Sequence, residues 1–112
     1  MRQHHVQYTV ERVAWGDACP ALASVRRAVF IEEQRVPEDM EWDGHDAAAI
    51  HAVATSLGGE PIGTGRLLPD GRIGRMAVLA AWRGLGVGGA ILRLLLDAAR
   101  EQGNAEVKLH AQ

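Results

Sequence analysis

A strand, a glycine-rich turn and a long helix follow one another in residues 72–103, and this order constrains the fold more than any other feature. The apolar pattern predicts a strand over residues 73–78 and a helix over residues 90–102, which ends at Gly103. Four glycines lie in residues 84–89, where they allow a ligand to approach the backbone closely. The first turn of the helix presents unpaired N–H groups and a positive dipole end, so the stretch predicts a phosphate site.

The glycines have the spacing of more than one phosphate-binding pattern. Gly84, Gly86 and Gly89 fit the dinucleotide fingerprint, which requires a parallel strand–helix–strand unit with an acidic residue ending the next strand. Here hairpin-like strands precede the loop, and Glu106 begins the next strand, so the context disfavours this alternative. A loop of the Gly-Lys-Ser/Thr type is excluded because Ala90 follows the last glycine. A glycine-rich helix start that binds no ligand stays open.

The segment Arg83-x-x-Gly86-x-Gly88 is similar to the pyrophosphate loop of the GNAT acyltransferase superfamily, in which Arg or Gln precedes two spaced small residues. Residues 71–78 resemble the strand before that loop, and residues 107–112 resemble the strand after its helix. In the family, acetyl-CoA lies between these two strands. The resemblance therefore implies acetyl-CoA as the cosubstrate. The implied contacts are Met76, Ala77, Val78, Arg83, Gly84, Leu85, Gly86, Val87, Gly88 and Gly89.

Hydrophobic periodicity predicts the rest of an α/β fold. We expect a helix that starts near Pro20, is capped by Asp17 and ends near Gln34. Turns at Gly58-Gly59 and at residues 69–71 join the later strands into an antiparallel meander. The expected strands are residues 6–14, 49–56, 61–68, 73–78 and 106–111.

The resulting β-α-β-β-β-α-β order matches the first two-thirds of the GNAT fold, and the family's final helix and strands have no counterpart in the sequence. We therefore expect residues 1–112 to form a single, C-terminally incomplete GNAT-like domain. The apolar edge at Val107 and Leu109 would then be completed by further residues or covered by a partner chain, such as a second copy in a homodimer.

Acyl transfer needs a group that removes a proton from the acceptor amine, and the sequence offers an excess of carboxylates between residues 32 and 46. They are Glu32, Glu33, Glu38, Asp39, Glu41, Asp43 and Asp46. In the family this segment walls the acceptor pocket, which implies a cationic amine; an ordinary solvated acidic loop is the alternative.

The segment Val29-Phe30-x-x-Glu33-Gln34-x-x-Pro37 resembles a bacterial GNAT subgroup. We predict Glu33 as the general base, because it lies one helical turn after an apolar anchor, with His51 and His110 as further candidates. The family commonly uses a late tyrosine as the acid, and the sole tyrosine here is on the first strand. The spacing of the acidic and histidine residues around His51 matches no metal site, so we expect no metal.

The amino-acid composition limits which partners the protein can bind and in which cellular compartment we expect it. A net charge of −2 gives no general attraction to nucleic acid or to anionic membranes, and no apolar stretch has the length of a membrane span. The lone Cys19 fits a reducing compartment, so we expect a cytoplasmic protein. The sequence thus predicts an N-acetyltransferase that transfers an acetyl group from acetyl-CoA to a primary amine. A non-catalytic acyl-CoA-binding or interaction module is the alternative.

Overall fold

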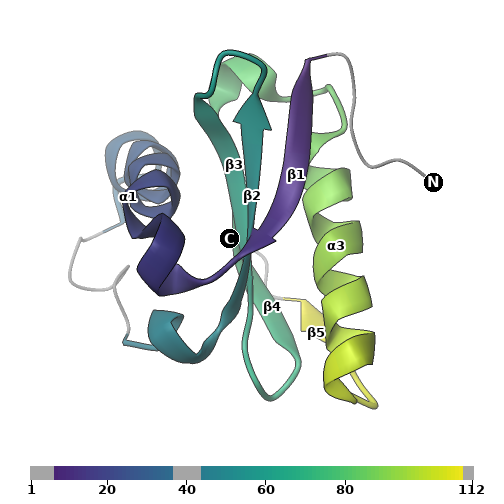
Figure 1. The fold of residues 1–112 in the computed structure, drawn as a ribbon. Helices are drawn as coiled ribbons and strands as arrows, with labels where there is room; N and C mark the ends of the chain where they lie inside the picture. Colours follow the sequence, from purple (N-terminus) through teal and green to yellow (C-terminus); the bar gives the residue numbers. More distant parts are fainter. Residues whose placement is uncertain (1–6, 37–43, 110–112) are drawn as a thin grey trace.

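The computed structural model describes residues 7–36 and 44–109, which form a five-stranded sheet with one helix against each face (Figure 1). Two long helices, α1 and α3, lie on opposite sides of this sheet, and short helical turns connect the other elements. In chain order the elements are β1 (Tyr8–Val13), α1 (Trp15–Arg26), the π-helix η1 (Arg27–Glu33), η2 (Asp46–Ala48), β2 (Ile50–Ser56), β3 (Pro61–Leu67), β4 (Arg72–Val78), η3 (Ala80–Trp82), α3 (Val87–Gln102) and β5 (Lys108–Leu109).

The strands lie in the sheet in the order in which they occur in the sequence. β1, β2, β3 and β4 pair antiparallel with their neighbours, and β5 pairs parallel with β4. This arrangement confirms the predicted α/β fold, in which an antiparallel meander leads into a strand, a loop, a helix and a parallel strand. The parallel pairing follows from α3, which carries the chain back along the sheet before β5 begins.

The helix α3 packs directly on β3 because two glycines of that strand leave room for it. A Cβ atom at Gly63 would lie 2.9 Å from Cγ1 of Val87, and one at Gly65 would lie 2.7 Å from Cγ2 of Ile91. Ile91 and Leu95 are fully buried in this layer, where apolar side chains of α3 meet the sheet. The apolar face of α3 therefore packs on the part of β3 that contains Gly63 and Gly65.

The helix α1 and its continuation η1 cover the opposite face through Val25 of α1 and through Val29 and Phe30 of η1, which pack with Ala77 of β4. Its start differs from the sequence prediction, because the helix begins at Trp15 and contains Pro20 in its interior. Proline favours the first helical turn, which explains the error, but here it only removes one backbone hydrogen bond within the helix.

The predicted cap of α1 is also wrong. Ala14 occupies the N-cap and provides no side-chain hydrogen bond, while Asp17 lies in the first turn. A carboxylate in the first turn interacts favourably with the positive end of the helix dipole without capping a backbone N–H group.

The strand β5 is shorter than the sequence predicts within the described residues, since it contains only Lys108 and Leu109. Its position depends on Gly71, whose φ is +93° and whose carbonyl accepts a hydrogen bond from the backbone N–H of Lys108 at 3.1 Å. A Cβ atom at Gly71 would lie 2.5 Å from the backbone oxygen of Glu106, so glycine is required there. None of the helices in these described segments is long and apolar enough to span a membrane.

Candidate active site

The glycine loop turns into α3 at Gly86, three residues earlier than the sequence predicts. Gly86 is the N-cap of the helix and has a left-handed conformation with φ +85°, so Val87, Gly88 and Gly89 form the first helical turn. The prediction of a start at Ala90 was wrong because it treated every glycine as part of the turn. No side chain caps the helix. The backbone N–H groups of this first turn therefore remain available to an anion.

Tyr8 supports the loop from β1. Its hydroxyl donates a hydrogen bond to the carbonyl oxygen of Leu85 at 3.2 Å, and a Cβ atom at Gly86 would lie 3.5 Å from the same hydroxyl. The ring is almost completely buried, and this burial raises the pKa of Tyr8 above its ordinary value. The sequence analysis missed this role, since a tyrosine in an alternating strand gives no signal of contact with a loop 77 residues later.

A β-bulge in β4 lies beside the loop. The register moves by one residue between the pairs Thr64–Ala77 and Arg66–Gly74, so Gly65 faces both Arg75 and Met76. Arg75 has φ +51°, a left-handed conformation that is rare for a non-glycine residue in a strand. The described residues of β5 pair with Arg72 and Ile73, which come before this bulge in β4.

The backbone of Val78 faces the edge of β4 that lies toward β5. The N–H group of Leu79 donates to the carbonyl of Ile62 on β3 at 2.9 Å, so these two residues form a hydrogen-bonded pair. Groups of the preceding pair, Gly63 and Val78, therefore point away from one another. The N–H and C=O groups of Val78 are thus directed to the edge at which the resemblance places acetyl-CoA.

Arg83 lies at this same end of β4. Its Nε atom donates to the carbonyl oxygen of Val78 at 2.9 Å, and its two Nη atoms donate to the carboxylate oxygens of Glu33 at 2.7 and 2.8 Å. The structure thus brings together the predicted phosphate ligand and the predicted base, which lie 50 residues apart in the sequence. The hydrogen bonds from Arg83 hold the pKa of Glu33 below its ordinary value and raise the pKa of Arg83. A carboxylate in this state is a weak proton acceptor.

The placement of Glu33 follows from the π-helix that extends α1. Its wider turn is closed by a hydrogen bond from the N–H of Gln34 to the carbonyl of Val29 at 2.9 Å, five residues back. Phe30 is fully buried in this segment while Glu33 remains exposed. Single π-helical turns are frequent at functional sites, because they rotate the following side chains relative to an α-helix.

His51, the second candidate base, lies in a buried polar cluster on the α1 side of the sheet. Only 1% of His51 is exposed, and its Nε2 atom lies 2.9 Å from the backbone oxygen of Asp46. Burial lowers the pKa of His51 below its ordinary value. Its ring also contacts Trp15, with 5.3 Å between the ring centroids. These contacts fit a structural role better than proton transfer, and the catalytic role of His51 stays a prediction.

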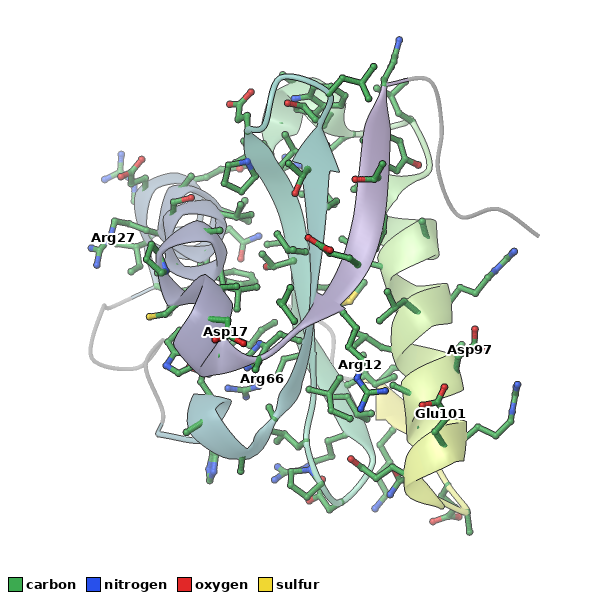
Figure 2. All side chains as sticks on the ribbon, in the orientation of Figure 1. Arg12, Asp17, Arg27, Arg66, Asp97 and Glu101 are labelled. Atoms are coloured by element: carbon green, nitrogen blue, oxygen red, sulfur yellow. The ribbon has the colours of Figure 1, made fainter. Side chains whose placement is uncertain are left out.

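Asp46 is the centre of that cluster. Its Oδ1 atom accepts hydrogen bonds from Nη1 of Arg26 at 2.8 Å and from Nη1 of Arg66 at 3.1 Å. Figure 2 shows Arg66 between the sheet and α1. Asp46 is therefore a buried counter-ion to two arginines, and the idea that it adds charge to an acidic pocket wall is incorrect. Composition alone gave no sign of this cluster.

Other predicted residues lie outside the described part of the chain. They include His110, the third candidate base, and the acidic residues Glu38, Asp39, Glu41 and Asp43. Within residues 7–36 and 44–109, no group of three or more His, Cys, Asp or Glu side chains is placed to hold a metal ion.

The family follows from comparison with known proteins. The sequence model of the Acetyltransferase (GNAT) family matches residues 17–112, so the chain belongs to the GNAT family, whose members use acyl-CoA. It is 38% identical over 91 residues to YjcF of Bacillus subtilis, described as an uncharacterized N-acetyltransferase. That match covers 79% of this chain and 64% of YjcF. The chain thus spans less than two-thirds of the length of the curated relatives it matches.

Solved structures agree with this assignment. A Lactobacillus plantarum protein superposes with a TM-score of 0.82 at 29% identity, covering 94% of this chain and 75% of that one. An acyl-CoA N-acyltransferase from Pseudomonas aeruginosa gives a TM-score of 0.72 at 30% identity, covering 84% of this chain and 71% of that one.

Proposed function

We propose that this chain binds acetyl-CoA along the edge of β4 at Val78 and the loop that enters α3, and transfers the acetyl group to a primary amine. The observation that carries the proposal is the continuous set of backbone donors at this place. It begins with the N–H of Val78 at the strand edge and continues with the uncapped first turn of α3 after Gly86.

The residues present fit the phosphates of CoA. The first turn of α3 lacks a side-chain cap, and Gly84 and Gly86 both have left-handed conformations that expose the backbone. A Cβ atom at Gly89 would meet no other atom within 4 Å, which shows open space at the helix start. Arg83 adds a planar guanidinium, suited to bind phosphate oxygens.

The thioester of acetyl-CoA supplies an acyl group with a thiolate leaving group, and the backbone would provide the electrostatic part of the reaction. As the oxyanion donor we propose a backbone N–H group within Met76–Val78, where the N–H of Val78 faces the edge. A backbone donor held by the sheet needs no reorganisation when charge develops on the carbonyl oxygen. As the amine forms the new C–N bond, it loses a proton and the departing sulfur gains one.

The acceptor is proposed to be a cationic amine. This follows from the resemblance, in which the acidic segment after the first helix walls the acceptor pocket, since the charge of Glu33 itself is paired with Arg83. That Glu33 is the general base stays a prediction. Its ion pair with Arg83 lowers its pKa and so makes it a weaker proton acceptor.

A non-catalytic acyl-CoA-binding module is the second candidate, favoured by the same ion pair and by the burial of His51. Free thiol released from acetyl-CoA in the presence of a panel of primary amines separates the two. We expect amine-dependent thiol release. CoA binding without thiol release for any amine would support the non-catalytic module, and absence of both would contradict the proposal.

A further inference from the structure

The ion pair between Glu33 and Arg83 joins the end of η1 to the start of the glycine loop. Glu33 ends the π-helix on the α1 side of the sheet, and Arg83 follows η3 at the start of the glycine loop. Both side chains are nearly half exposed, at 44% and 43%. Exposed ion pairs add little to global stability, so the pair is better explained by what it does locally.

The geometry of the pair fixes the guanidinium. Arg83 uses both Nη atoms on one carboxylate and its Nε atom on the carbonyl of Val78, so the plane of the group is held on two edges. These bonds use three of its five N–H donors. Counting the described residues alone, two donors remain for a phosphate group, on a side chain that would otherwise sample many rotamers.

We propose that Glu33 is a positioning residue, which holds the side chain of Arg83 at the end of β4 so that acetyl-CoA meets an ordered guanidinium. This inference rests on the proposed function, since it takes the phosphates of CoA as the ligand of Arg83. Glu33 then acts through Arg83, and its carboxylate stays ionised during the reaction.

The sign of the effect on affinity makes the proposal testable. Simple electrostatics predict that removing a carboxylate beside an anion site will improve the binding of CoA. Positioning predicts the opposite, because loss of the bidentate contact releases the guanidinium. We expect Glu33→Gln to weaken CoA binding by about tenfold, comparable to the loss of one charge-assisted hydrogen bond. Glu33→Asp, which keeps the carboxylate on a shorter side chain, should recover part of the affinity.

The experiment is isothermal titration of CoA into the wild-type protein and its variants. Glu32→Gln is the matched control, since Glu32 is an exposed neighbour and both Nη atoms of Arg83 bind Glu33 instead, and it should leave the dissociation constant unchanged or slightly lower. Arg83→Gln tests whether the effect of Glu33 on CoA binding depends on Arg83. If Glu33 acts through Arg83, the double variant Glu33→Gln, Arg83→Gln should bind CoA no more weakly than Arg83→Gln alone.

Kinetics separate positioning from base catalysis. Positioning predicts that Glu33→Gln raises the KM for acetyl-CoA while kcat at saturating acetyl-CoA and its pH profile stay unchanged. A tighter dissociation constant in Glu33→Gln would overturn the proposal. So would an unchanged dissociation constant with a lower kcat and a flattened pH profile, which would identify Glu33 as the base. A wild-type protein that fails to bind CoA would instead overturn the proposed function itself.

Discussion

Arg26 and Asp46 form an ion pair of 2.8 Å between side chains that are 1% and 7% exposed. The pair links α1 to the short helix η2, which precedes β2, and Arg66 of β3 donates to the same carboxylate oxygen. One buried carboxylate thus pairs with two arginines, and it links the helix, the segment that follows it and the sheet.

Replacement of Asp46 by Asn should destabilise the protein strongly. The substitution removes the negative charge that two buried arginines share, and breaking a buried ion pair in this way costs about 3–5 kcal/mol in the free energy of unfolding. Urea unfolding followed by circular dichroism measures this change. Asp70→Asn is the control, because Asp70 pairs with Arg72 at the same 2.8 Å but with both side chains exposed, and its effect on the free energy of unfolding should be much smaller. Equal effects of the two substitutions would contradict the burial argument.

His51 should make the stability depend on pH on the acidic side of neutrality. Burial lowers its pKa in the folded protein below the ordinary value of 6.5, so the unfolded chain binds the proton more readily. Stability from this group is therefore complete above pH 6.5 and falls as the pH drops toward the folded pKa. The slope for one proton is at most about 1.4 kcal/mol per pH unit.

The variant His51→Gln measures this contribution, because an amide can still donate to the carbonyl of Asp46 and does not titrate. The difference in unfolding free energy between wild type and variant, recorded from pH 8 downward, should shrink below about pH 6.5. A difference that stays constant or grows with acid would show that His51 is not kept neutral by burial.

The order of helices and strands could be predicted because it follows from local sequence patterns of apolar residues and turn residues. Alternating apolar residues mark the strands, and the turn at Gly71 forces the chain into β4. The limits of both helices were less accurate, since Pro20 and Gly89 occur inside helical turns that other interactions stabilise. A residue that favours a helix end on average does not determine where a packed helix ends.

For the candidate active site, the sequence predicted the part that is formed by backbone groups and did not predict the contacts between side chains. The glycine at position 86 predicts the left-handed turn that precedes the helix. No residue pattern around Arg75 predicts a left-handed conformation within a strand. The contact between Glu33 and Arg83 spans 50 residues, so each side chain could be proposed for a role while their pairing could not. Likewise, the burial of Asp46 depends on two arginines that lie 20 residues away on either side.

Close packing of α3 on β3 predicts that Gly65→Ala is destabilising. The added methyl group would lie 2.7–2.8 Å from side-chain atoms of Met76, Ile91 and Leu95, so these side chains must move, at an expected cost of about 1–3 kcal/mol. Gly16→Ala in α1 is the control, because its methyl group would meet no atom within 4 Å. In a helix this change should stabilise by about 0.5–1 kcal/mol. Thermal melts of the two variants should therefore shift in opposite directions from wild type, and a neutral Gly65→Ala would show that the helix can move away from the sheet.

CoA and acetyl-CoA should stabilise the protein against thermal unfolding, whereas NAD should not, because the loop belongs to a GNAT fold and not to a dinucleotide-binding unit. A ligand present at 100 times its dissociation constant adds about 2.7 kcal/mol. A larger shift with NAD, or none with CoA, would contradict the assignment of the loop.

Gly86→Val should abolish the shift with CoA, because a β-branched side chain is strained at φ +85° and blocks access to the first turn of α3. Gly103→Val provides a control at the other end of the same helix, where φ is +86° and an added Cβ atom would meet no atom within 4 Å. The two variants carry the same backbone strain, so both should melt below wild type by a similar amount. Only Gly103→Val should keep the shift with CoA, since its strain lies away from the loop. Retained CoA stabilisation in a folded Gly86→Val variant would place the phosphate site elsewhere on the molecule.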